Sequence, residues 1–296
     1  MLAALPLNFS VSIGNCMFDL HSHLLPGIDD GAPDLETSLA MARAFADQGV
    51  ECVACTPHIL PGLYHNSGPQ IRRAVAALQL KVEDAGIPLK LVTGADNHIV
   101  PDFVDGLKRG HLLPLGDSAY VLVEPPHHVA PARLEDLFFD ILLAGYIPVL
   151  THPERLSWIE SKYDVMGRLV ERGVWMQITS GSLLGRFGRR PRYWAERMLE
   201  EGLVHILATD AHNMRARPPD LLDGRIRAEE LAGKAEAEHL VVTRPGGALM
   251  NKRPEALPPP HAGELTREPH ENDGPAKTSN RRDGSGLGQR MRRLFS

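Results

Sequence analysis

The chain has 296 residues, of which 43% are hydrophobic and 23% charged, and its formal net charge is −5. These values are typical of a globular protein with one large domain or two ordinary ones. The acidic balance gives no reason to expect nucleic acid as a partner, and no apolar run approaches the roughly 18 residues of a membrane-spanning helix.

The N-terminal residues 1–16 are predicted to be an unstructured extension. They are mildly apolar, but they lack the positive region and the long apolar region of a signal peptide. A start codon assigned too early, with Met17 as the native start, is the alternative explanation.

The three cysteines, Cys16, Cys52 and Cys55, are too few for a disulfide scaffold. They are typical of a reducing cytoplasm, where we expect the protein to act. The spacing of Cys52 and Cys55 matches a redox or zinc half-motif, but the Val-Ala between them indicates the interior of a strand.

From Phe18 onward, strand and helix patterns alternate along the chain. Strands are predicted in the run that begins at Phe18 and over 50–55, 89–93, 119–123, 147–150, 174–178 and 204–208. Helices are predicted over 34–48, 71–82, 103–108, 131–144, 163–172 and 191–201, and a turn of small residues over 179–182. This alternation favours parallel strands with crossover helices, in an open sheet or a barrel. No Gly-x-Gly-x-x-Gly follows the first strand, which disfavours a nucleotide-binding sheet.

Residues of metal-binding type stand where the predicted strands end. His21 and His23 are two residues apart, so their side chains point to the same face of a strand. The other residues of this kind are His58, Asp96, Glu124, His152, Asp210 and His212. Because the carboxyl ends of parallel strands in a barrel meet on one face, we expect these side chains to converge.

Imidazole and carboxylate ligands without thiolates suit Mn²⁺, Fe²⁺ or Zn²⁺, and several carboxylates indicate more than one ion. Such a cluster activates water and binds the oxygens of a transferring phosphoryl group. Arg155 and Arg217 lie close in sequence to these ligands, and a guanidinium offers a planar fork to phosphate oxygens. Surface salt bridges are the alternative role for both arginines.

Several separated motifs resemble, in order and spacing, those of the PHP-family bacterial protein tyrosine phosphatases of the CpsB/YwqE type. The motifs are Asp19-Leu-His-Ser-His23 with Leu-Pro-Gly-Ile-Asp-Asp-Gly31, Thr56-Pro-His58, Gly145-Tyr-Ile-Pro-Val-Leu-Thr-His-Pro-Glu-Arg155, Gln177-Ile-Thr-Ser-Gly-Ser182 and Thr209-Asp-Ala-His-Asn213. The resemblance covers about residues 17–255. It implies a distorted TIM-like (β/α)7 barrel, the PHP fold, which we place at 17–251 as a single domain.

The resemblance also implies a metal site of two to three ions, usually Mn²⁺. The implied ligands are His21, His23, Asp30, His58, Asp96, Glu124, His152, Asp210 and His212. Asp30 enters this set through the family motif alone. Arg155 and Arg217 are the implied catalytic residues that bind the substrate phosphate.

Two places depart from the family pattern. The family usually has Glu where this chain has Asp96, and because Asp is one methylene shorter, metal bridging there calls for a backbone shift. His127 and His128 replace family residues beside Glu124, where they line the mouth of the site or are simply solvated.

The implied activity is hydrolysis of phosphotyrosine on a bacterial tyrosine autokinase, which regulates capsular and exopolysaccharide synthesis. One alternative is another phosphoesterase of the same fold, acting on histidinol phosphate or another small molecule. A second alternative is a catalytically weak regulatory protein. Residues 252–296 are predicted to be a disordered tail, whose basic and apolar end is a solvated terminus or a docking peptide for an anionic surface or a partner.

Overall fold

The computed structural model describes residues 16–261, and the remaining parts of the predicted extension and tail lie outside the described residues. The strands in this range pair in parallel in two sheets. The first sheet has the order β1 (Met17–Ser22), β2 (Val50–Cys55) and β4 (Lys90–Thr93). The second has the order β3 (His58–Ile59), β5 (Asp96–His98), β6 (Tyr120–Glu124), β7 (Ile147–Thr151), β8 (Trp175–Thr179) and β9 (Ile206–Ala208).

The two sheets form one distorted barrel. Only two residues separate β2 from β3, and two separate β4 from β5, so each pair amounts to one interrupted strand. Between β1 and the segment after β9, Ser22 pairs with Ala211, and the amide of His23 donates a hydrogen bond of 2.9 Å to the Ala211 carbonyl. When each interrupted pair is counted as one strand, seven parallel strands enclose the centre. The expected distorted (β/α)7 barrel is thus confirmed.

The alternation of side chains on β6 shows how the sequence builds both faces of the barrel. Tyr120 and Leu122 belong to the apolar cluster inside the barrel, whereas Val121 and Val123 belong to the cluster beneath the surrounding helices. Glu124 has the same parity as the inward residues, so the strand ends with a carboxylate directed to the inner face. The same two-residue period that forms the core thus delivers polar groups to the carboxyl end.

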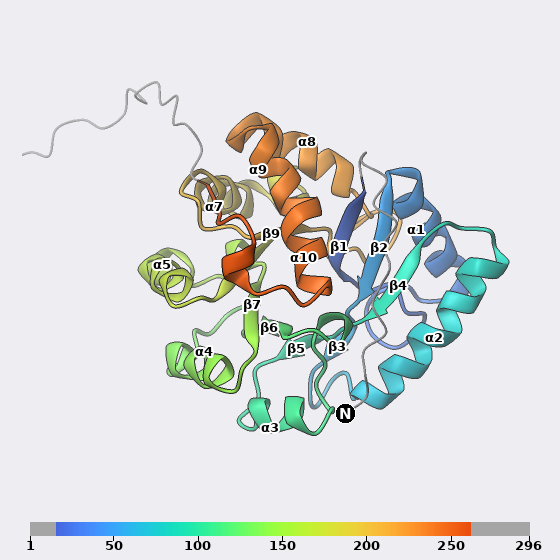
Figure 1. Cartoon of the computed structure of the whole chain (residues 1–296), viewed down its shortest axis with the longest axis horizontal. Coiled ribbons are helices and arrows are strands. Elements are labelled where there is room, and N and C mark those ends of the chain that lie inside the picture. Colours follow the sequence, from blue (N-terminus) through green and yellow to red (C-terminus); the bar gives the residue numbers. More distant parts are fainter. Residues whose placement is uncertain (1–15, 262–296) are drawn as a thin grey trace, which may run out of the picture. The chain divides into compact units, whose positions relative to one another are not determined.

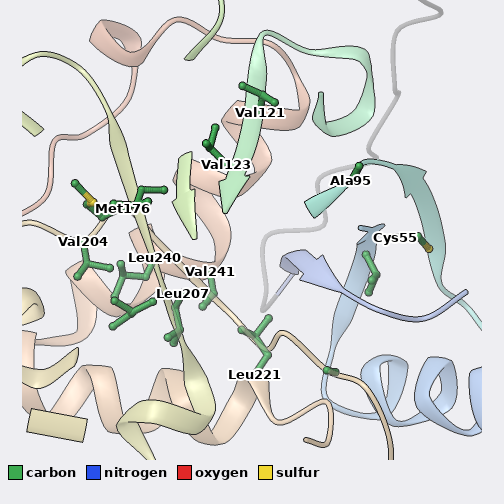
Figure 2. Packing of buried hydrophobic residues seen from close by; sticks show 14 of the residues in the cluster. Cys55, Ala95, Val121, Val123, Met176, Val204, Leu207, Leu221, Leu240 and Val241 are labelled. Atoms are coloured by element: carbon green, nitrogen blue, oxygen red, sulfur yellow. The ribbon is translucent and has the colours of Figure 1, made fainter. Parts of the chain in front are cut away.

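The helices pack around the strands, as Figure 1 shows. They are α1 (Leu35–Asp47), α2 (Gly68–Asp84), α3 (Phe103–Lys108), α4 (Leu134–Leu143), α5 (Tyr163–Glu171), α7 (Arg189–Glu200) and α8 (Leu221–Ala232). Figure 2 shows part of the interface, in which Met176 and Leu207 on strands lie near Leu221, Leu240 and Val241. Among the described helices, none is long and apolar enough to cross a membrane.

Local chemistry explains the first helix boundary. The side chain of Asp34 accepts a hydrogen bond of 2.8 Å from the amide of Thr37, which makes Asp34 the N-cap of α1. Gly49 follows the helix with a φ of 83°, a left-handed conformation that glycine adopts without steric cost. The predicted turn over 179–182 is different, because Ser180–Leu183 form the short helix α6.

The sequence patterns did not predict the elements after residue 213. Besides α8, they are α9 (Lys234–Glu238), the π-helical turn η4 (His239–Thr243), α10 (Arg244–Leu249) and the short 3-10 helix η5 (Pro254–Ala256). Ala248 and Leu249 pack against the cluster inside the barrel. At Gly246, an added Cβ atom would lie only 3.0 Å from the ring of Phe18 on β1, so α10 approaches the strand closely. This helix closes the amino-terminal end of the barrel.

A buried ion pair anchors this closing segment. The guanidinium of Arg244 is fully buried and donates two hydrogen bonds of 2.8 Å to the carboxylate of Glu236. Its other donors reach the carbonyls of Pro258 (2.8 Å) and Pro259 (2.9 Å). The arginine thereby satisfies backbone groups that would otherwise be buried without partners.

The sequence placed the end of the folded domain at residue 251, and the structure extends the packed part further. Leu257 is buried with the apolar cluster inside the barrel, and the hydroxyl of Tyr120 donates a hydrogen bond of 2.9 Å to the carbonyl of Lys252. Together with the contacts of Arg244, these interactions place residues through Pro259 in the domain. The apolar signal at this place is a single leucine among prolines, which is too little for a periodic pattern.

His205 gives the fold a pH dependence that can be measured. Its ring stacks on Trp175, and its Nδ1 atom accepts a hydrogen bond of 3.2 Å from the Met176 amide. Burial, with a contribution from the charge of Arg244, lowers the pKa of His205 to about 3. In the unfolded chain the pKa is about 6.5. Between these two pKa values only the unfolded chain binds a proton at His205. The titration of His205 therefore leaves the free energy of unfolding unchanged above pH 6.5 and lowers it as the pH decreases from 6.5 towards 3.

We expect the parent protein to lose about 2 kcal/mol more unfolding free energy than His205→Gln between pH 7 and pH 5. Glutamine cannot take up the proton, but its oxygen can still accept a hydrogen bond. Urea denaturation at the two pH values measures the difference, in which titrations at other sites cancel. Equal losses in both proteins would show that His205 does not carry this dependence.

Candidate metal centre

The nine predicted ligand residues meet at the carboxyl end of the barrel. Each supplies an atom to at least one group of three or four side chains whose ligand atoms lie within 4.8 Å of one another. The groups are His23, Asp30, His58 and His212; His58, Asp96, His98 and Glu124; His21, His23 and Asp96; His21, His152 and Asp210; and Glu124, His127 and His152. Shared members join the five groups into one connected cluster. Their role as ligands stays a prediction.

An irregularity in β1 directs its histidines into this cluster. Phe18 and Leu20 face the apolar interior, so strict alternation would turn His21 outward. Between Asp19 and Ser22, however, the register with β2 slips by one residue, as in a β-bulge. Such a bulge re-aims the following side chains. The side chain of Asp19 holds the distortion, since it accepts hydrogen bonds from the amides of His21 (2.9 Å) and Thr209 (3.0 Å).

Asp210, in the segment that pairs with the end of β1, links His21 and His23. Its Oδ1 atom lies 3.4 Å from Nε2 of His21 and 3.3 Å from Nε2 of His23. His21 also approaches Asp96, with 3.5 Å between its Nε2 atom and Oδ2. These atoms are all buried, so they form the deepest part of the site.

The mouth of the site is more open. Oδ1 of Asp30 lies 3.4 Å from Nε2 of His58 and 3.5 Å from Nε2 of His212. The Asp30 side chain is 45% exposed and that of His58 12%, so a ligand from solvent can reach them. On the opposite side, Glu124 approaches His58, His98, His127 and His152.

The structure shows two orienting residues that the sequence analysis did not single out. The side-chain oxygen of Gln177 lies 2.8 Å from Nδ1 of His21, and a carboxylate oxygen of Asp29 lies 2.7 Å from Nδ1 of His23. Partners of this kind fix the ring so that its Nε2 atom faces the site. Gln177 had a detectable signal, because it is a polar residue within an otherwise apolar strand.

Two site residues have a left-handed backbone. His152 has a φ of 33° and Asp210 a φ of 52°, values that residues other than glycine adopt infrequently. Such conformations cost free energy, and they persist where the surrounding structure fixes them, often at functional sites. His152 directly follows β7 and Asp210 lies two residues after β9, and in both cases a ligand-type side chain enters the cluster.

Unpaired atoms in the cluster fit divalent cations. Both carboxylate oxygens of Asp96 and Oδ1 of Asp210 are buried and accept no hydrogen bond, and Nδ1 of His152 and Nε2 of His212 also make no hydrogen bond. Buried polar atoms without partners are costly, so their concentration here points to a bound ligand. Carboxylate oxygens and imidazole nitrogens are the donors that Mn²⁺, Fe²⁺ or Zn²⁺ would use.

The protonation equilibria agree with this fit. Burial lowers the pKa of His152 well below its usual range, and the charge of Arg155 lowers it further, so this imidazole is neutral. Burial opposes the charged form of His58, yet Asp96 and Glu124 raise its pKa to about 11. A proton on His58 therefore balances carboxylate charge when no ion is bound, and binding of a divalent cation would release it.

The two predicted phosphate-binding arginines lie together at the edge of the cluster. Arg155 and Arg217 both donate to Oδ2 of Asp210. Burial opposes ionisation of Asp210, but Arg217 and His21 outweigh this effect and hold its pKa well below the usual range. The ring of Phe187 packs against both guanidinium groups, at 4.5 Å from Arg155 and 6.0 Å from Arg217.

The sequence of the chain is similar to those of known proteins. Residues 17–250 match the family described as "Capsular polysaccharide synthesis, CpsB/CapC". The chain is 40% identical over 201 residues to "Tyrosine-protein phosphatase YwqE" of Bacillus subtilis (strain 168), which covers 68% of this chain and 79% of that protein. It is 27% identical over 245 residues to "Tyrosine-protein phosphatase CpsB" of Streptococcus agalactiae serotype V, covering 79% and 99%.

The fold is also similar to a solved structure. The work that it comes from describes "YwqE from Bacillus subtilis and CpsB from Streptococcus pneumoniae, unique metal-dependent tyrosine phosphatases". The superposition has a TM-score of 0.77 at 34% identity and covers 85% of this chain and all of that chain. Because the family match spans most of the folded domain, the chain belongs to the CpsB/CapC family of capsular polysaccharide synthesis.

Proposed function

We propose that this chain is a metal-dependent protein-tyrosine phosphatase whose substrate is a tyrosine autokinase of a polysaccharide export system. The main support for this proposal is that the nine ligand-type residues lie together beside two arginines. The similar YwqE and CpsB proteins are named tyrosine-protein phosphatases, and the family description refers to capsular polysaccharide synthesis. Through this activity the protein would regulate capsule and exopolysaccharide synthesis from the cytoplasm.

The nine side chains would hold two to three divalent ions, of which Mn²⁺ is our first choice and Fe²⁺ or Zn²⁺ are alternatives. When bound, such ions lower the pKa of water and neutralise charge on phosphoryl oxygens. Gln177 and Asp29 would keep His21 and His23 oriented for this purpose.

Arg155 and Arg217 would bind the terminal oxygens of the phosphate. Their side chains are 15% and 21% exposed, so both guanidinium groups can be reached from the mouth of the site. A planar guanidinium can donate two parallel hydrogen bonds to a phosphoryl group. The leaving group would be a phenol with a pKa of about 10, which departs more readily than an alkyl alcohol and reduces the need for a strong general acid.

Removal of metal tests the proposal directly. Treatment with EDTA followed by dialysis should abolish phosphate release from a phosphotyrosyl peptide, because the bound ions would both lower the pKa of the attacking water and neutralise charge on the phosphoryl oxygens. Addition of Mn²⁺ should restore the activity. Turnover that is indifferent to EDTA and Mn²⁺ would contradict metal-dependent hydrolysis.

Substrate comparison separates the proposed activity from its alternatives. Phosphate release from a phosphotyrosyl peptide should exceed release from histidinol phosphate at equal concentration and with Mn²⁺ present. A preference for histidinol phosphate would favour a small-molecule phosphoesterase. Bound ions without turnover on either compound would favour a catalytically weak regulatory protein. Loss of phosphotyrosine from a purified autokinase would test the proposed partner.

A further inference from the structure

His98 lies inside the cluster although it was not among the predicted ligands. It ends β5, two residues after Asp96, so both side chains emerge on the same face of the strand. In the register between β5 and β6, His98 stands directly opposite Glu124. Its Nε2 atom contacts Oε2 of Glu124 and lies 3.2 Å from Nδ1 of His58.

Four ligand atoms therefore surround one point between β3, β5 and β6. Nδ1 of His58 lies 3.3 Å from Oδ2 of Asp96 and 3.3 Å from Oε2 of Glu124, and Nε2 of His98 completes the group. Two imidazole nitrogens and two carboxylate oxygens are donors that suit a first-row divalent ion. Both oxygens of Asp96 are buried and accept no hydrogen bond, which independently favours a cation at this point.

Among the described residues, His98 belongs to this group alone, whereas each of the other three members also belongs to a second group. His58 also belongs to the group with Asp30, Asp96 to the group with His21, and Glu124 to the group with His152. Shared residues must divide their donor atoms between neighbouring ions. His98 is thus the side chain that is free to serve this ion alone.

We propose that His98 is a direct metal ligand, which completes an ion site with His58, Asp96 and Glu124. The second imidazole would shift the preference of this site from Mg²⁺ towards Mn²⁺, Fe²⁺ or Zn²⁺. The inference rests on the metal centre of the proposed function but does not depend on phosphotyrosine as the substrate.

The competing role for His98 is orientation of Glu124 by a hydrogen bond. His127 makes such a contact, with 2.9 Å between its Nε2 atom and Oε1 of Glu124. Two substitutions separate the roles. His98→Ala removes both the nitrogen ligand and the hydrogen bond, whereas His98→Gln keeps an N–H donor for Glu124 but lacks the imidazole. His111→Ala is the matched control, because His111 is exposed and belongs to no group of potential ligands among the described residues.

Metal binding is measured on the full-length protein without any substrate. Each protein is stripped with EDTA and titrated with Mn²⁺ by calorimetry, and its metal content after dialysis is determined by mass spectrometry. We expect both His98 variants to lose one ion per chain or to bind that ion at least about 10-fold more weakly. The loss of a residue that only orients a metal ligand already lowers metal affinity by about 10-fold or more, and the loss of a direct ligand should cost no less. The His111 variant should match the parent.

Three results would overturn the inference. Parental affinity in both His98 variants would exclude any role in binding, and parental affinity in His98→Gln alone would assign His98 to orientation of Glu124. A parent chain that binds no ion would remove the metal centre itself. Conversely, the parent could bind Mn²⁺, and both variants could bind it more weakly, while the parent hydrolyses no phosphotyrosyl peptide. That result would contradict the proposed function and support His98 as a ligand.

Discussion

His152→Ala is expected to lower kcat/KM for a phosphotyrosyl peptide by more than about 100-fold, since loss of even an outer-shell partner of a metal costs 10- to 100-fold. Its Nε2 atom lies 3.5 Å from Oε1 of Glu124, and the residue groups with His21 and Asp210 as well. His152 therefore stands between two potential ion sites. Its low pKa keeps the imidazole neutral and able to bind metal.

The control for this substitution must separate the ligand from the backbone. Because His152 has a left-handed φ, alanine adds strain, whereas asparagine tolerates this conformation. His152→Asn should therefore fold with less strain than His152→Ala and still lose most of the activity. His128→Ala makes the same change at an exposed histidine near the mouth and should behave as the parent. Circular dichroism and phosphate release measure the two effects, and undiminished hydrolysis by folded His152 variants would refute the assignment.

Glu236→Ala should destabilise the fold by about 3–5 kcal/mol, because removing one partner leaves the other charge buried and uncompensated. Arg244 has no exposed surface, and the carboxylate of Glu236 accepts two hydrogen bonds of 2.8 Å from it. The arginine cannot reach solvent, and its remaining acceptors are backbone carbonyls such as that of Pro258. The closing segment α10 should consequently detach from the barrel first.

A surface pair in the same region provides the comparison. Glu230 is 58% exposed and pairs with Arg227 at 2.7 Å, so Glu230→Ala should cost less than about 1 kcal/mol. Urea denaturation of both variants in EDTA gives the two free energies of unfolding without a contribution from bound metal. A loss for Glu236→Ala no larger than for Glu230→Ala would show that the buried pair does not hold the segment.

The sequence by itself determined the order of the longer strands and helices up to residue 208, because apolar periods of two and 3.6 residues are local properties. It also placed ligand-type residues at the strand ends, and a barrel necessarily gathers such ends on one face. It did not predict the short elements β3, β5 and α6. It could not reveal the segment after residue 213. Helix α10 is short and contains Pro245, Gly246 and Gly247, so its helical state depends on packing against the barrel rather than on local propensity.

Only the tertiary structure decided which polar residues act together. The direction of His21 depends on a slip in strand register, which no periodic pattern records. Asp29 and Gln177 become orienting partners through contacts across six and 156 residues of sequence separation. His98 enters the cluster because β5 stands beside β6 in a register that places it opposite Glu124. Apart from the local contact of Asp29 with His23, these are relations between distant segments, and they exist only once the barrel has closed.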